Sequence, residues 1–256
     1  MFFMKDKGSQ GMIRKIYTLA KGLASLLNPK KWGPFLEIYD LSKFDHGVSL
    51  SWSQGGEDLA LIPFLRNVDK GRYLDIGAHH PDRFSVTRGL YQKGWTGVNV
   101  EANPNLIQEF IKRRPKDLTL CYAVGPEPEY VLNIFSEPAI STASSEWKEK
   151  FLSENQTIVD RIIVKGISLN KLITEHFPSK GPDLLVIDVE GLDYDVIQSM
   201  EPKKLSSNQL PTLIVVETPV GVDEVMTTPM YLYLVKIGYQ AMCILPMSTI
   251  FKKIGP

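Results

Sequence analysis

The chain has 256 residues, of which 43% are hydrophobic, and its formal net charge at pH 7 is zero. A chain of this length can bury one substantial core, so we expect one domain with an appendage rather than two equal domains. Nucleic-acid binding usually shows as a basic excess that neutralises phosphates. Because this chain has no such excess, no nucleic-acid partner is expected.

The cysteines and the hydropathy of the chain predict a cytoplasmic protein. Cys121 and Cys243 stand in apolar, strand-like runs and form no metal or redox motif, which predicts buried thiols in a reducing compartment. No apolar run is long enough to span a bilayer, and the N-terminus lacks the cleavage site of a secretory signal.

The segment 1–48 is predicted to be a basic amphipathic extension, and 49–256 the main domain. Between Asp6 and Glu37 every charged residue is basic, and leucine, isoleucine and alanine are interleaved with these charges. This pattern is typical of a helix that lies on an anionic membrane surface. A terminal helix that packs on its own domain has the same pattern, so peripheral membrane contact stays one of two interpretations.

The main domain alternates strand-like and helix-like patterns, which predicts an α/β fold with a mostly parallel sheet. Between 130 and 164 the pattern changes to short strand-like pieces and a Ser/Thr-rich loop, 140–145, which we assign to substrate contact. The expected elements are a helix over 59–65, a strand over 73–76, a helix over 85–93, a strand over 95–101, a helix from Asn103, a strand over 118–124, a helix over 168–177, strands over 183–189 and 213–216, a helix over 230–236, and an antiparallel hairpin of 239–245 with 248–253.

Two neighbouring strand ends predict an adenosine site. The first strand stops at Gly77 and Ala78, whose small side chains let the backbone come close to a ligand. The second strand ends in Glu101, where a carboxylate can accept hydrogen bonds from both hydroxyls of a ribose. The alternative is that the strand-end carboxylates, Asp75 included, only cap neighbouring helices.

The residues after Gly77 narrow the choice of ligand. A dinucleotide fold needs G-x-G-x-x-G, and this loop instead continues with His79, His80 and Asp82, which crowd and repel a pyrophosphate. Asp75 suits a cationic or zwitterionic ligand better than a polyanion. S-adenosylmethionine meets these conditions, and the sequence therefore predicts a methyltransferase with a Rossmann-like class I fold and a C-terminal antiparallel hairpin.

The chain resembles the FkbM family of S-adenosylmethionine-dependent methyltransferases across roughly 51–251. The matching motifs are Ser53-Gln54 with Glu57-Asp58, Leu74-Asp-Ile-Gly-Ala78, Ser85 and Thr87, Gly94-Trp-Thr-Gly97, Val100-Glu-Ala-Asn-Pro104, Ala123-Val-Gly125, Ser141-Thr142 and Ile187-Asp-Val-Glu-Gly191. The resemblance implies cofactor binding by these loops, Ala123 included. It also implies O-methylation of a hydroxyl on a sugar, a glycan or a secondary metabolite.

An alcohol is a poor nucleophile, so we expect a general base or a metal ion beside it. The candidate catalytic residues are His79, on the loop after the first strand, and Asp188 and Glu190, after the fourth. If the strand stays extended, Asp188 and Glu190 lie on one side, where like charges raise one pKa or bind a divalent cation. Glu217 is a candidate third oxygen ligand of such a cation, and a hydrogen bond to backbone is the alternative role of His79.

Three other functions stay open. An NAD-dependent oxidoreductase on the same sheet is disfavoured by the missing glycines. A catalytically silent methyltransferase-like module would bind a glycan or a partner through the loop 140–145. A membrane-recruited scaffold would use the basic N-terminal helix. The acceptor and the oligomeric state stay open.

Overall fold

The computed structural model describes residues 51–255, so the predicted extension over 1–48 lies outside the described part of the chain. The central sheet is formed by β1 (Arg72–Ile76), β2 (Thr96–Glu101), β3 (Leu118–Cys121), β7 (Leu184–Ile187), β8 (Leu213–Glu217), β9 (Tyr239–Ile244) and β10 (Ser248–Lys253). The helices are α3 (Glu57–Ala60), α4 (Ile62–Leu65), α5 (Arg88–Gln92), α6 (Pro104–Arg113), α7 (Ser145–Ser153), α8 (Leu169–His176), α9 (Asp193–Gln198), α10 (Val222–Val225) and α11 (Pro229–Lys236).

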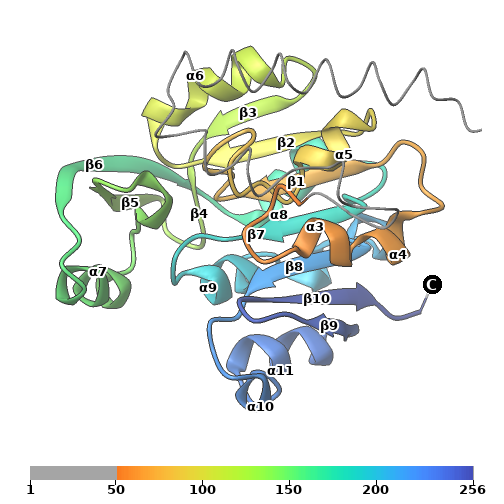
Figure 1. Ribbon diagram of the computed structural model, residues 1–256. Helices are drawn as coiled ribbons and strands as arrows, with labels where there is room; N and C mark the ends of the chain where they lie inside the picture. Colours follow the sequence, from red (N-terminus) through yellow and green to blue (C-terminus); the bar gives the residue numbers. More distant parts are fainter. Residues whose placement is uncertain (1–50, 256) are drawn as a thin grey trace, which may run out of the picture. The chain divides into compact units, whose positions relative to one another are not determined.

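The seven strands stand in the order β3-β2-β1-β7-β8-β10-β9 (Figure 1). β3, β2, β1, β7 and β8 run parallel, whereas β10 is antiparallel to both β8 and β9. The predicted α/β fold with a C-terminal antiparallel hairpin is therefore confirmed. The carboxyl ends of the parallel strands lie at one edge of the sheet. The predicted site residues that end or follow these strands therefore lie close together at that edge.

Two hydrophobic cores cover the two faces of this sheet because successive strand residues point in opposite directions. On β1, Tyr73 packs in one core with Leu61 and Leu65 of the first helical segment. The next residue, Leu74, packs in the other core with residues of α8, α9 and α11. Each fully buried Leu or Ile contributes about 1.5–3 kcal/mol.

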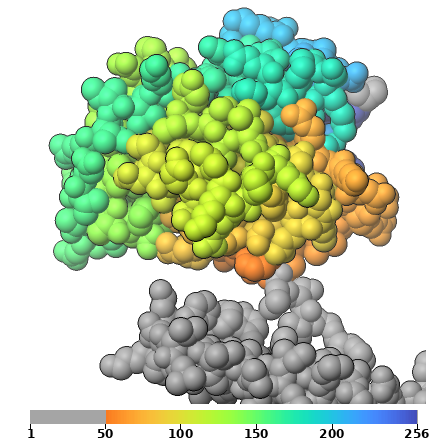
Figure 2. Space-filling view, turned by 90° about the horizontal axis from the view of Figure 1, so that it is seen from above, coloured from red at the N-terminus to blue at the C-terminus, as the bar shows by residue number. Residues whose placement is uncertain are grey.

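A second, three-stranded sheet stands beside the main one. Its strands are β4 (Ala123–Val124), β5 (Glu129–Phe135) and β6 (Ile158–Ile167), in the order β4-β6-β5. The segment from β5 to β6, which we call the insertion, also carries the short 3-10 helix η2 (Pro138–Ile140) and α7. In Figure 2 this green insertion flanks the yellow face built by residues of α5 and α6, with the orange first helices on the other side.

The insertion is more regular than the sequence pattern predicts. The prediction of short strand-like pieces over 130–164 is wrong, because β5 and β6 pair antiparallel from Glu129 with Lys165 to Phe135 with Ile158, whereas the Ser/Thr-rich stretch between η2 and α7 does form a loop. Alternate apolar residues of the hairpin, Leu132, Ile134 and Val164, bury a small core with Ala123. That core stabilises long strands that a local pattern does not reveal.

The strand predicted over 118–124 is divided at Tyr122. β3 pairs with β2, whereas Ala123 and Val124 find their backbone partners in β6, so the chain leaves the main sheet at this point. The thiol of Cys121 is exposed at the end of this edge strand, and Cys243 is partly buried, which corrects the prediction of two buried thiols.

Two predicted helices also differ in extent. The helix over 59–65 forms as two short helices that meet at Leu61. The helix over 85–93 begins only at Arg88, because Ser85 and Thr87 lie buried in a hydrogen-bond network of the preceding loop. No helix in the described range 51–255 is long and apolar enough to cross a membrane.

Candidate active site

Two adjoining cavities open at the carboxyl edge of the main sheet. The first, which we call the β1–β2 cavity, is lined by Gly77, His79, Glu101, Tyr122 and Ala123 together with residues of the insertion. The second, the β7–β8 cavity, has a volume of about 320 Å³ and is lined by Glu57, Arg83, Trp147, Lys150 and Glu217. Three residues, Ala139, Asp188 and Glu190, line both cavities.

Gly77 allows the loops after β1 and β7 to meet. It has a φ of 74°, and a Cβ added there would lie 1.6 Å from the carbonyl oxygen of Asp188. The N–H groups of Gly77 and Ala78 both donate to the carbonyl of Val100, at 3.0 and 3.2 Å. A glycine is therefore required by both the left-handed backbone and the close approach.

Glu101 is a buried carboxylate at the wall of the β1–β2 cavity. Its Oε1 accepts the N–H of Asn103 at 2.7 Å, and its Oε2 accepts the N–H of His79 at 2.8 Å. Burial raises the pKa of this carboxyl, and the backbone hydrogen bonds oppose that shift. Each oxygen keeps a further lone pair, so the carboxylate can still accept hydrogen bonds from a ligand in the cavity.

The imidazole of His79 faces the same cavity without a partner. Both ring nitrogens are buried and have no hydrogen-bond partner among the described residues. Burial, followed by the nearby charge of Arg83, lowers the pKa of His79 to about 4. The ring is therefore neutral at pH 7, and one nitrogen can donate while the other accepts.

Asp188 and Glu190 lie where the two cavities join. Asp188 is accessible from the cavities, yet the surrounding protein and the charge of Glu190 raise its pKa well above the ordinary value. The pKa of Glu190 is raised to about 7 by burial and by Asp193, while Lys150 opposes the shift. The strand does not stay extended as far as Glu190, because β7 ends at Ile187 and Glu190 has a φ of 54°.

Glu217 at the end of β8 adds a third carboxylate to the β7–β8 cavity. Its Oε2 is buried and has no hydrogen-bond partner in the described range, and burial together with Asp188 raises its pKa to about 10. The described residues contain no group of three or more His, Cys, Asp or Glu side chains placed to hold a metal ion. We call Asp188, Glu190 and Glu217 the junction carboxylates.

Asp75 points away from both cavities. Its carboxylate accepts a hydrogen bond from Thr87 at 2.5 Å, and it lines neither cavity. Thr87 in turn accepts from Arg114 at 2.8 Å, and Arg114 also donates to Ser85 and to the carbonyl of Pro81. The side chain of Arg114 is fully buried.

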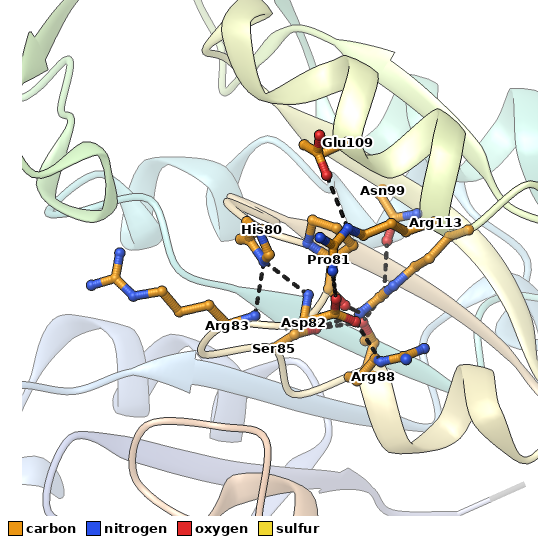
Figure 3. A network of polar contacts seen from close by, with 11 residues as sticks. His80, Pro81, Asp82, Arg83, Ser85, Arg88, Asn99, Glu109 and Arg113 are labelled. Carbon is orange, nitrogen blue, oxygen red and sulfur yellow. Dashed lines mark hydrogen bonds and ion pairs between the residues drawn. The ribbon is translucent and has the colours of Figure 1, made fainter. Parts of the chain in front are cut away.

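The outer part of this network holds the loop between β1 and α5 (Figure 3). The imidazole Nδ1 of His80 accepts the N–H groups of Asp82 and Arg83 at 3.0 and 2.9 Å. The carboxylate of Asp82 pairs with Arg88 and Arg113. We call the Asp75–Thr87–Arg114 contacts and these outer pairs the loop network.

Sequence reasoning missed several residues of the site. Trp147, Lys150 and the Arg83–Glu137 ion pair come from contacts between the insertion and the β1 loop. Glu57, which the sequence shows only as part of a motif shared with the family, lines the β7–β8 cavity and accepts a hydrogen bond from Ser248 at 2.8 Å. Arg114 gives no local signal, because an arginine after an amphipathic helix normally faces solvent.

The mostly parallel sheet with a C-terminal antiparallel hairpin is a Rossmann-like α/β fold, and the sequence match assigns it to the methyltransferases. Residues 75–241 match the methyltransferase FkbM domain. The chain therefore belongs to the FkbM methyltransferase family, which confirms the resemblance found in the sequence.

Several solved structures have a similar arrangement of elements at low sequence identity. A TehB-like SAM-dependent methyltransferase from Corynebacterium glutamicum is 10% identical, with a TM-score of 0.39, covering 89% of this chain and 98% of that one. A putative O-methyltransferase from Klebsiella pneumoniae is 10% identical, with a TM-score of 0.41, covering 83% and 84%. A putative RNA methyltransferase from Pyrococcus horikoshii is 11% identical, with a TM-score of 0.41, covering 84% and 96%. A comparison with curated proteins found no match.

Proposed function

We propose that this methyltransferase transfers the methyl group to a hydroxyl of a sugar, a glycan or a secondary metabolite. The observation that carries the proposal is the position of Asp188 and Glu190, which line both cavities. A ligand in the β1–β2 cavity and a ligand in the β7–β8 cavity would thus meet beside two carboxylates. That juxtaposition is what methyl transfer to an alcohol needs.

The β1–β2 cavity suits S-adenosylmethionine. Glu101 would accept hydrogen bonds from the ribose hydroxyls, the backbone at Gly77 and Ala78 would approach the ligand, and Ala123 would form part of the wall. The two orphaned nitrogens of His79 are costly unless a ligand supplies partners. When bound, the cofactor supplies an electrophilic methyl group on a cationic sulfur.

The β7–β8 cavity suits the acceptor. Aromatic side chains, Trp147 and Phe151 among them, form apolar walls, and the junction carboxylates supply hydrogen-bond acceptors. We assign Asp188 as the general base, because its raised pKa and its access to both cavities let it take the hydroxyl proton. Glu190 is the second candidate. His79, with a pKa near 4 and a place in the β1–β2 cavity alone, is better suited to ligand binding than to proton removal.

The cofactor assignment is tested by calorimetric titration of the full chain with S-adenosylmethionine, S-adenosylhomocysteine and NAD. The first two are expected to bind, and NAD is not. The variant Glu101→Ala should weaken both affinities by about tenfold or more, since a hydrogen bond to a charged group contributes about 1.5–3 kcal/mol. Binding of NAD alone would refute the methyltransferase assignment.

The base is tested with Asp188→Asn in an acceptor screen that starts with sugars. General-base catalysis contributes about 10²–10⁴-fold, so turnover should fall by that factor while cofactor affinity stays within a few-fold. A variant that keeps full turnover would remove Asp188 from the mechanism. If the unmodified chain binds cofactor but methylates nothing, a silent binding module becomes the better interpretation.

A further inference from the structure

Glu190 has a backbone conformation that its residue type disfavours. Its φ of 54° lies in the left-handed region, and the following Gly191 has a φ of 99°. Residues other than glycine, asparagine and aspartate rarely adopt this region, and they keep it only where the surrounding structure enforces it. Because Glu190 lines both cavities, whatever enforces its backbone conformation also sets the position of its carboxylate.

One hydroxyl of the insertion reaches this backbone. The Oγ1 of Thr142 donates to the carbonyl oxygen of Glu190 at 2.7 Å, and Thr142 is fully buried. Thr142 is itself fixed to β5, because its N–H and carbonyl exchange hydrogen bonds with Asn133 at 3.1 and 2.9 Å. The side chain of Asn133 adds a third bond, from Nδ2 to the Thr142 carbonyl at 3.1 Å.

The same hydroxyl also fixes the start of α7. It accepts the N–H of Ser144 at 2.9 Å, and Ser144 caps α7 by accepting the N–H of Trp147. The indole of Trp147 lies directly against Gly191, since a Cβ there would be 2.2 Å from the indole Cδ1. Consecutive residues of the β7 loop, Glu190 and Gly191, are thus contacted by one short segment of the insertion.

We propose that Thr142 is a positioning residue that acts through Glu190. Its hydroxyl holds the Glu190 backbone in the left-handed conformation, and this directs the carboxylate toward the cationic sulfur of the cofactor where the cavities join. The inference rests on the proposed function, because it takes the β1–β2 cavity as the cofactor site. It makes the insertion part of the binding site for S-adenosylmethionine.

The test is a double-mutant cycle measured by calorimetry with S-adenosylmethionine, which needs no knowledge of the acceptor. The proteins are the unmodified full chain, Thr142→Val, Glu190→Gln and the double variant. Thr142→Ser keeps the hydroxyl and serves as the rescue. Thr174→Val is the matched control, because Thr174 is exposed and its hydroxyl bonds only carbonyls of its own helix, α8.

We expect Thr142→Val and Glu190→Gln each to weaken cofactor binding by about tenfold, the size of one lost hydrogen bond or charge contact. The double variant should be no weaker than Glu190→Gln alone, because Thr142 then has no carboxylate to position. Thr142→Ser and Thr174→Val should stay within about twofold of the unmodified chain. Cofactor affinity should also fall as the pH falls through about 7, where Glu190 takes up a proton beside Asp193 and Lys150, and Glu190→Gln should show a weaker pH dependence.

Multiplicative losses in the double variant would overturn the positioning role, as would unchanged affinity in Thr142→Val. Circular dichroism checks the fold of each protein, and Thr142→Ala replaces Val in the cycle if the Val variant does not fold. If the unmodified chain binds no cofactor, the proposed function fails together with this inference. If it binds cofactor and the two substitutions lower the affinity independently, only the inference fails.

Discussion

The loop network and the junction carboxylates are two polar regions whose groups differ in their hydrogen-bond partners. In the loop network, the two terminal nitrogens of the fully buried Arg114 donate to Thr87, Ser85 and the Pro81 carbonyl, and Thr87 donates to Asp75, so that of these groups only the Arg114 Nε lacks a partner in the described range. Among the junction carboxylates, Glu217 keeps an oxygen that is buried and without a partner in the described range. The three carboxyls there have raised pKa values because burial, followed by the charges of neighbouring carboxylates, disfavours their charged forms; for Glu190 that neighbour is Asp193.

The difference separates structural polar groups from functional ones. A buried group whose hydrogen bonds are satisfied within the protein holds a loop in place and has little capacity left for a ligand. A buried group left without partners costs stability, and it is retained where a ligand supplies the partner. By its contacts Asp75, predicted to bind the cofactor, belongs with the loop network, whereas both ring nitrogens of His79 lack a partner in the described range.

The largest effect on cofactor binding is expected at Gly77, where the loop after β1 contacts the loop after β7. In Gly77→Ala the new Cβ would lie 1.6 Å from the carbonyl oxygen of Asp188, so one loop must move. A misplacement of about 1 Å can lower the rate of a catalysed reaction by about a hundredfold. We expect the cofactor affinity of Gly77→Ala, measured by calorimetry, to fall by a comparable factor.

Gly94→Ala is the matched control for this variant. Gly94 also has a left-handed backbone, with a φ of 91°, but no atom lies within 4 Å of an added Cβ. It should lose about 1 kcal/mol of stability from backbone strain and keep its cofactor affinity. Equal losses of affinity in both variants would show that strain, and not the contact with Asp188, makes the glycine necessary.

The next effect tests the loop network. Arg114→Met removes a buried cation and leaves its acceptors unpaired, so the free energy of unfolding should fall by about 3–5 kcal/mol in denaturant titrations. Arg113→Met, which removes an exposed partner of Asp82, should cost much less stability than Arg114→Met. A small loss at Arg114 would contradict the view that the loop network stabilises the fold.

The smallest effect tests the junction carboxylates. Here the substitution is expected to raise the stability of the chain, whereas Arg114→Met lowers it. The pKa of Glu217 is raised to about 10 in the folded chain, so at pH 7–9 the folded state holds a proton that the unfolded state releases. Without ligand, the melting temperature should therefore rise as the pH falls from 9 to 7. His79, whose pKa is lowered to about 4, opposes this gain only below about pH 6.5.

Glu217→Gln should stabilise the ligand-free chain at pH 9 by about 1 kcal/mol, or about 2–4 °C, and should flatten the pH dependence. The measurement is thermal unfolding followed by circular dichroism at several pH values. A melting temperature that falls in the variant would mean that Glu217 is already satisfied by its surroundings.

The sequence predicts the sheet and the location of the site because both depend on local patterns. Apolar runs mark the buried strands, and the parallel order brings Glu101, Asp188 and Glu217 to one edge. The direction in which a strand-end side chain points is harder to predict. Asp75 turns toward Thr87 because the buried Arg114, 39 positions away in sequence, supplies the compensating charge.

The structure of the insertion could not be predicted either, because it also depends on contacts between residues far apart in the sequence. The pairing of β5 with β6 spans a long, polar intervening segment, and its stability comes from a small core shared with Ala123 of β4. The left-handed backbone of Glu190 depends on Thr142, which lies on another element. Contacts between residues far apart in the chain decide these features, and no local pattern carries them.

The close approach of Gly77 to Asp188 also has a consequence for how acceptor preference can change. Backbone atoms directly after two core strands set the spacing between the proposed cofactor loop and Asp188, the proposed base, whereas Trp147, Lys150 and Phe151 shape the β7–β8 cavity from the insertion. These three side chains do not line the β1–β2 cavity. Substitutions in the insertion can therefore change which acceptors fit the β7–β8 cavity without changing the spacing between Gly77 and Asp188.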